Sequence, residues 1–109
     1  MNLENLTKQL IQIESISPND AGCFDILESV LEGMNFSCER ISYKNVENLY
    51  AVIGSQGPTL CFLGHTDVVP TGPSDQWTYP PFSGETHEDH IYGRGAADMK
   101  GNICAFIEA

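Results

Sequence analysis

Apolar residues recur at intervals of three and four along the first third of the chain, and this spacing predicts two helices. The first covers residues 3–13, and a Ser-Pro-Asn-Asp stretch at residues 17–20 interrupts it. That stretch also offers an N-cap for a second helix over about residues 20–33, which stops near Gly33. The apolar stripes are Leu3, Leu6, Leu10 and Ile13 in the first helix, and Phe24, Leu27, Val30, Leu31 and Met34 in the second.

Beyond Gly33 the pattern changes to that of short strands. Residues 36–43 alternate loosely, whereas residues 48–53 and 59–63 are nearly continuous apolar runs separated by a Gly-Ser-Gln-Gly-Pro turn. Continuous apolar strands are typical of a sheet that is covered on both faces. These elements together predict an α/β chain.

The second half of the chain is rich in loop residues. Residues 68–84 hold four prolines and the only tryptophan, Trp77, which predicts an ordered loop. Residues 85–92 fit a short hairpin, and a further helix begins near Met99. Because the sequence stops inside this helix, we expect these 109 residues to be the N-terminal part of a longer α/β catalytic domain.

Charge and composition exclude several classes of partner. Fifteen acidic residues against five basic residues give a net charge of −10, which argues against nucleic acid and anionic membranes. We find no signal peptide and no apolar run near the roughly 20 residues that a membrane helix needs, so we expect a cytoplasmic protein. The four cysteines form no C-x-x-C pair, so we interpret them as reduced and mostly buried thiols.

A His-x-Asp pair follows the apolar run at residues 59–63. Side chains at positions i and i+2 of a strand share one face, so His65 and Asp67 are expected side by side, with Thr66 pointing away. One interpretation is a metal-bound imidazole whose other nitrogen is held by Asp67, or direct ligation by Asp67. The other is a pair that only hydrogen-bonds the loop backbone. The pair alone leaves both open.

A second aspartate, Asp98, emerges from a glycine-rich turn at the start of the last predicted helix. An aspartate can bridge two divalent ions roughly 3.5–4 Å apart in a hydrolytic site. Alternatively, Asp98 caps the helix that starts near Met99. The histidines at 87 and 90 are three positions apart and do not form an H-E-x-x-H motif, so we place them at an exposed hairpin tip.

Four segments of the second half are recognisable together. They are Gly64-His65-Thr66-Asp67-Val68-Val69-Pro70, Gln76-Trp77, Pro80-Pro81-Phe82 and Tyr92-Gly93-Arg94-Gly95-Ala96-Ala97-Asp98-Met99-Lys100-Gly101. They closely resemble the co-catalytic zinc amidohydrolases related to aminoacylase and carboxypeptidase G. The resemblance implies a three-layer, zinc-exopeptidase-like catalytic domain with a mixed sheet between helices.

The resemblance also implies roles for three side chains. His65 would be a ligand of one zinc ion, Asp98 would bridge two zinc ions, and Asp67 would be the catalytic-support carboxylate that orients His65. Cobalt is a possible substitute for zinc. The peptide between Asp98 and Met99 would be cis. The general-base glutamate, the remaining metal ligands and a dimerisation domain would all lie after Ala109.

Within the family, the Ser15–Asp20 stretch and Ala96-Ala97 favour the branch that hydrolyses N-succinyl-LL-2,6-diaminopimelate in lysine biosynthesis. The expected partner is therefore a small N-succinyl amino acid, and the complete protein is expected to be a homodimer. A deacylase of acetylornithine or another N-acyl amino acid is the first alternative. The second is a truncated chain with no catalytic activity.

Overall fold

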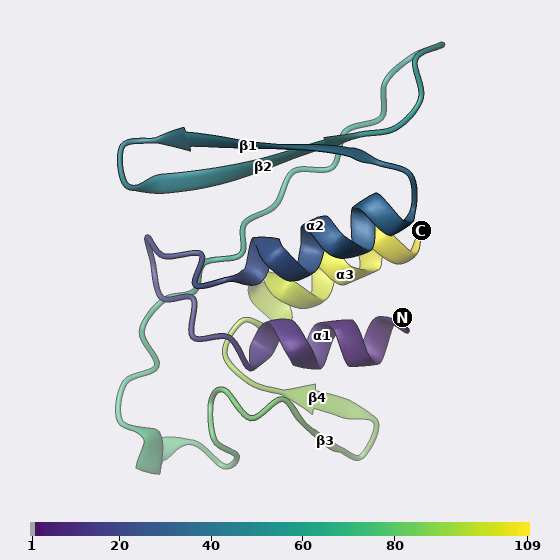
Figure 1. Ribbon diagram of the computed structural model, residues 1–109. Helices are drawn as coiled ribbons and strands as arrows, with labels where there is room; N and C mark the ends of the chain where they lie inside the picture. The colour runs from purple at the N-terminus through teal and green to yellow at the C-terminus, as the bar shows by residue number, and fades with distance from the viewer. Residues whose placement is uncertain (1) are drawn as a thin grey trace.

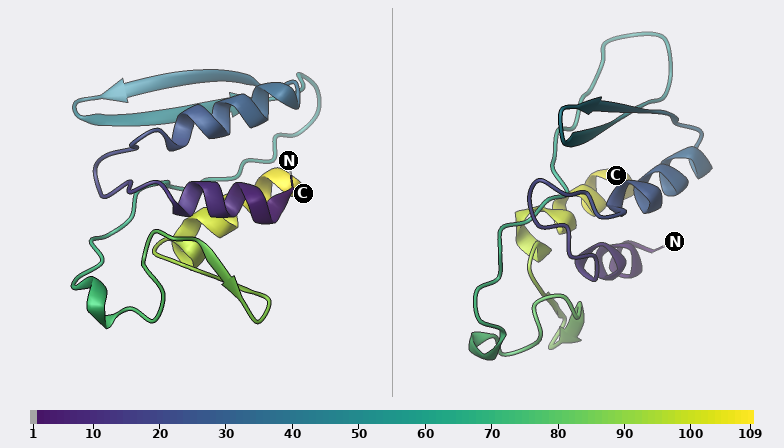
Figure 2. Two further views of the ribbon diagram at one scale, coloured as in Figure 1. Left: turned by 60° about the horizontal axis from the view of Figure 1, so that its bottom comes forward. Right: turned by 60° about the vertical axis from the view of Figure 1, so that its left-hand side comes forward.

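The computed structural model describes residues 2–109, which form three helices and two hairpins (Figure 1). The helices are α1 (Leu3–Ile11), α2 (Cys23–Gly33) and α3 (Gly101–Glu108), and a kinked turn, Ala96–Lys100, in which Asp98 and Met99 have non-helical backbone angles, leads into α3. The strands are β1 (Ser37–Tyr43), β2 (Val46–Val52), β3 (Glu85–His87) and β4 (His90–Tyr92). All three views place the helices between the two hairpins (Figures 1 and 2). The predicted α/β class is confirmed.

The first helix is shorter than its apolar pattern predicts. The side chain of Asn2 accepts a hydrogen bond from the backbone nitrogen of Asn5 at 2.8 Å, which caps the start of α1. The helix ends at Ile11, two residues before the predicted end. The carbonyl groups of Leu10 and Ile13, at and just after this end, accept hydrogen bonds from the buried Lys100 ammonium. These bonds satisfy carbonyl groups that would otherwise lack a helical partner.

The N-cap residue of the second helix is Gly22 and does not belong to residues 17–20 as predicted, although Asp20 still bonds the first turn. The carboxylate of Asp20 accepts hydrogen bonds from the backbone nitrogens of Gly22 and Phe24, at 3.1 and 3.0 Å. The helix then begins at Cys23, after Gly22 with a φ of 100°, and so starts later than the pattern suggested. The Asp20 carboxylate thus fixes the backbone at the start of α2.

One strand prediction is wrong. Residues 59–63 form no strand, and the side chains of Leu60 and Leu63 are 81% and 88% exposed. A strand requires a hydrogen-bonded neighbour, and residues 2–109 provide none for this segment. For the same reason these residues form two antiparallel hairpins and one parallel bridge, Ile16 to Val68, in place of the mixed sheet that the resemblance implied.

The β1–β2 hairpin covers α2 with one face only. Strand positions that face the helix are half-buried, and those on the opposite face are exposed, including Ile41, Tyr43 and Tyr50. The core itself lies between the helices and consists of Leu6, Leu10, Cys23, Leu27 and Cys104. Within residues 2–109 no helix has both the length and the apolar character that crossing a bilayer demands.

Burial divides the cysteines, all four of which are free thiols. Cys23 and Cys104 lie in the core, where burial raises the pKa of both thiols, whereas Cys61 is exposed. Only the thiolate is nucleophilic, so we expect Ellman's reagent to modify Cys61 rapidly in the 109-residue chain and to reach the two core thiols only after unfolding in urea. Loss of the rapid phase in Cys61→Ser is the control. Rapid modification of Cys23 or Cys104 in the folded chain would contradict the described core.

Candidate metal centre

A hollow of about 230 Å³ brings together the three predicted side chains from distant parts of the sequence. His65 and Asp67 come from the segment after residues 59–63, and Asp98 comes from the kinked turn before α3. The rest of the lining is Ser17, Val68, Val69, Gly93, Arg94, Gly95 and Ala97.

The imidazole of His65 lies between two aspartates. Its Nδ1 atom is 2.9 Å from the backbone carbonyl oxygen of Asp67 and 3.3 Å from that residue's Oδ1. Its Nε2 atom is 3.1 Å from Oδ1 of Asp98. A neutral imidazole carries hydrogen on one nitrogen only, so donation from Nδ1 to Asp67 leaves the Nε2 lone pair facing a carboxylate oxygen. That pair can share a cation, which is the arrangement that a metal-ligating histidine needs.

The alternation predicted for residues 65–67 is confirmed even though no strand forms there. Thr66 is buried, and its hydroxyl donates to Oδ1 of Asp20 at 3.1 Å, while His65 and Asp67 face the hollow. Thr66 is thereby tied to the residue that caps α2. The interior contact of Thr66 therefore sets the direction of both flanking side chains.

Asp98 does not cap a helix, so that alternative is wrong. Helix α3 has Lys100 at its N-cap position and no side-chain cap hydrogen bond. The side chain of Asp98 is 88% exposed and makes its ion-pair contact with His65. The peptide bond between Asp98 and Met99 is cis, as the resemblance implied.

Two glycines allow the backbone around Asp98 to pack closely. A Cβ atom on Gly95, whose φ is 86°, would lie 2.8 Å from Cγ1 of Val68. A Cβ atom on Gly101 would lie 2.4 Å from the carbonyl oxygen of Ala96. A larger residue at either position would therefore force the turn that carries Asp98 to move.

The donor set suits a transition metal but is incomplete. An imidazole nitrogen and a carboxylate oxygen are both common zinc ligands, and structural or catalytic zinc requires at least three protein donors. Across residues 2–109, no group of three or more His, Cys, Asp or Glu side chains is placed to hold one ion. The described residues thus supply two converging donors, His65 and Asp98, with Asp67 behind the imidazole.

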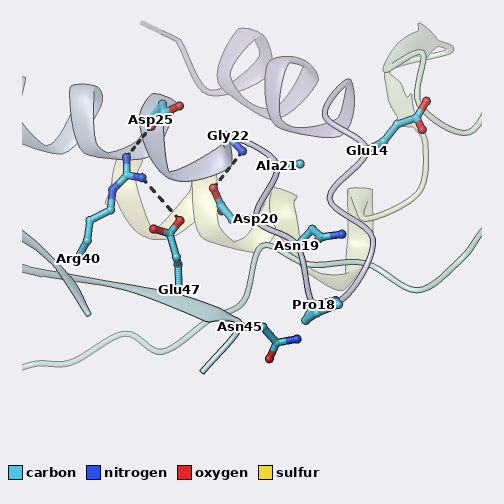
Figure 3. Close-up of a pocket in the computed structure, with 10 residues that line it drawn as sticks. All are labelled: Glu14, Pro18, Asn19, Asp20, Ala21, Gly22, Asp25, Arg40, Asn45 and Glu47. Atoms are coloured by element: carbon cyan, nitrogen blue, oxygen red, sulfur yellow. Dashed lines mark hydrogen bonds and ion pairs between the residues drawn. The ribbon is translucent and has the colours of Figure 1, made fainter. Parts of the chain in front are cut away.

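A larger hollow, of about 500 Å³, lies away from these side chains, beside α2 and the β1–β2 hairpin (Figure 3). Arg40 lines this hollow, and its guanidinium is already paired with Asp25 at 2.7 Å and Glu28 at 2.8 Å. Its one cationic side chain is thus already taken up by ion pairs, and size alone does not make this hollow a ligand site. The three side chains that the sequence singled out line the smaller one.

The sequence did not single out two contributors to the smaller hollow. The hydroxyl of Ser17 donates to Oδ2 of Asp67 across 50 positions of sequence. Arg94 stacks over the ring of Trp77, 5.0 Å from its centroid, while the indole nitrogen of Trp77 donates to the carbonyl of Thr71. The prolines-and-Trp77 loop is therefore packed, as predicted. The segments that contain both residues carried the resemblance, but nothing in their spacing revealed these contacts.

Comparison with known proteins agrees with the geometry. The chain is 50% identical to the succinyl-diaminopimelate desuccinylase of Rhodospirillum centenum over an alignment of 109 positions, which covers 95% of this chain and 28% of that relative. The desuccinylase of Methylobacillus flagellatus is 53% identical over 104 residues, with the same shares covered. Residues 61–109 match the model of Peptidase family M20/M25/M40. This match covers a little under half of the chain.

These similarities confirm the resemblance that the motifs indicated. The fold is shared with human carnosine dipeptidase 1, with a TM-score of 0.85 over 97% of this chain and 27% of that protein, at 24% sequence identity. That similarity speaks for the fold alone. The chain spans about 28% of the length of the curated relatives that it matches.

Proposed function

We propose that this chain is part of a zinc-dependent amide hydrolase that converts N-succinyl-LL-2,6-diaminopimelate to succinate and LL-2,6-diaminopimelate. The observation that carries the proposal is the convergence of His65 Nε2 and Asp98 Oδ1 at 3.1 Å in a hollow. The proposed substrate follows from the names of relatives whose sequences are about 50% identical to that of the chain.

In this proposal each residue has a separate task. His65 and Asp98 hold metal, zinc by preference with cobalt as a possible substitute, and Asp98 is the bridge between two ions. The backbone carbonyl of Asp67 keeps the hydrogen of His65 on Nδ1, and its carboxylate lies against the same nitrogen. When bound, such metals polarise the amide carbonyl and lower the pKa of a water molecule.

The remaining catalytic residues would lie outside residues 1–109, in a longer polypeptide that is called the longer protein below. Its length would be that of the relatives, and residues 1–109 would be the N-terminal part of its catalytic domain. The general-base glutamate, the other metal ligands and a dimerisation domain belong to the rest. We further propose a cytoplasmic homodimer.

The substrate is tested by assaying the longer protein with zinc on N-succinyl-LL-2,6-diaminopimelate and on acetylornithine. We expect kcat/KM for the succinylated compound to exceed that for acetylornithine by at least about 100-fold, because a site that pairs a distal carboxylate rejects analogues lacking it. Comparable turnover of the two compounds would support the acetylornithine alternative and reject our choice.

The isolated 109-residue chain is expected to show no hydrolysis and only weak zinc binding. Two donors leave a tetrahedral ion half-satisfied, so we expect a dissociation constant in the micromolar range or weaker. The measurement is competition with a chromophoric chelator, with His65→Ala as the matched control. Nanomolar affinity that depends on His65, or measurable turnover, would show that these residues make a complete site.

A further inference from the structure

The segment before Pro18 forms a platform under the candidate metal centre. Two backbone hydrogen bonds join it to the site: Ser17 nitrogen to Val68 oxygen at 3.0 Å, and Val68 nitrogen to Ser15 oxygen at 2.8 Å. The buried hydroxyl of Ser15 adds a bond to the carbonyl of Thr66 at 2.8 Å. Three hydrogen bonds that do not involve the Ser17 hydroxyl therefore hold the backbone on both sides of Asp67.

The Ser17 side chain has a different target, the carboxylate of Asp67. Its hydroxyl donates to Oδ2 of Asp67 and lies 3.3 Å from the carbonyl oxygen of Val68. The other carboxylate oxygen, Oδ1, is the one that approaches Nδ1 of His65 at 3.3 Å. Asp67 is exposed enough to rotate freely if Oδ2 is released, since its side chain is 41% exposed.

We propose that Ser17 is a positioning residue that acts on His65 through Asp67. By occupying Oδ2, its hydroxyl turns Oδ1 toward the imidazole and keeps the ring aimed at Asp98. The proposal rests on the metal-binding role proposed for His65. It assigns Ser17 no contact with substrate or metal, and it extends the chain of ordered groups to Ser17, Asp67, His65 and Asp98.

The test compares Ser17→Thr with Ser17→Val in the longer protein, because the two side chains share one shape and differ in the hydroxyl. Partners behind a metal-ligating histidine change affinity or activity by 10- to 100-fold, so for the more remote Ser17 we expect Ser17→Val and Ser17→Ala to lower kcat by about 10-fold. We expect zinc affinity, measured by chelator competition, to fall with kcat, and KM to stay within about twofold, since substrate binding is not touched. Ser17→Thr should retain both values.

Ser83→Ala is the matched control, because the Ser83 hydroxyl bonds only the nearby carbonyl of Pro80. If Ser17→Val equals Ser17→Thr in kcat and zinc affinity, the positioning role is wrong. If Ser17→Thr is too large for the site, Ser17→Ala decides alone, and wild-type behaviour of that variant overturns the proposal. Wild-type zinc affinity in His65→Ala would instead reject the proposed function itself, so the two failures are distinguishable.

Discussion

Replacing Asp98 by asparagine in the longer protein is expected to lower kcat/KM by at least about 1000-fold while leaving stability unchanged. Metal ions supply several kcal/mol of transition-state stabilisation, and each 1.4 kcal/mol or so is a factor of ten in rate. Asparagine preserves the shape and a hydrogen bond to His65 but removes the charge that a bridging ligand provides. Because the side chain is 88% exposed, no packing is lost.

The measurement pairs steady-state kinetics with metal analysis and thermal unfolding of the same sample. Asp75→Asn is the control, since Asp75 is an exposed carboxylate in the 3-10 turn Ser74–Gln76, outside the hollow. We expect Asp98→Asn to bind fewer zinc ions per chain, while the melting temperature of the metal-free protein stays unchanged. An active, fully metallated Asp98→Asn enzyme would refute the metal-bridging role of Asp98.

Replacing Lys100 by methionine is expected to reduce the free energy of unfolding by about 2 kcal/mol or more. The Lys100 side chain has no exposed surface, and its ammonium donates to the carbonyls of Leu10 and Ile13 at 2.7 and 2.8 Å. Hydrogen bonds from a charged donor are worth roughly 1.5–3 kcal/mol each. Burial lowers the pKa of Lys100, which reflects a desolvation cost that methionine avoids. The net loss is therefore smaller than the sum of the two bonds.

Urea unfolding of the longer protein measures this loss, followed by circular dichroism. Lys44→Met is the control, because Lys44 is exposed in the turn between β1 and β2 and its removal should be neutral. A Lys100→Met protein as stable as the wild type would show that the two buried hydrogen bonds contribute nothing net.

Local patterns predicted the local elements well. The helices and the β3–β4 hairpin depend on the spacing of residues that lie close together in the sequence. For this reason α1, α2 and the turn at Glu88 and Asp89 appear near the expected positions. The strand expected at residues 59–63 depends on a neighbour elsewhere in the polypeptide. Its apolar sequence could not reveal that residues 2–109 provide no such neighbour.

The candidate site shows the same division. The geometry of His65 and Asp67 could be predicted because an i to i+2 relationship is local, and the approach of Asp98 was implied by a family motif. The contacts of Ser17 and Lys100 were not predicted, since they span 50 and 87 to 90 positions. A lysine is ordinarily a surface residue, so a sequence alone gives little reason to place one in the interior.

Through the ammonium of Lys100, the N-terminal helix α1 also supports the candidate metal centre. No residue of α1 lines the hollow, yet the carbonyls at its end fix a side chain two positions from Asp98. Removing the first thirteen residues would take away both acceptor carbonyls of the Lys100 ammonium and release the turn that presents the Asp98 carboxylate.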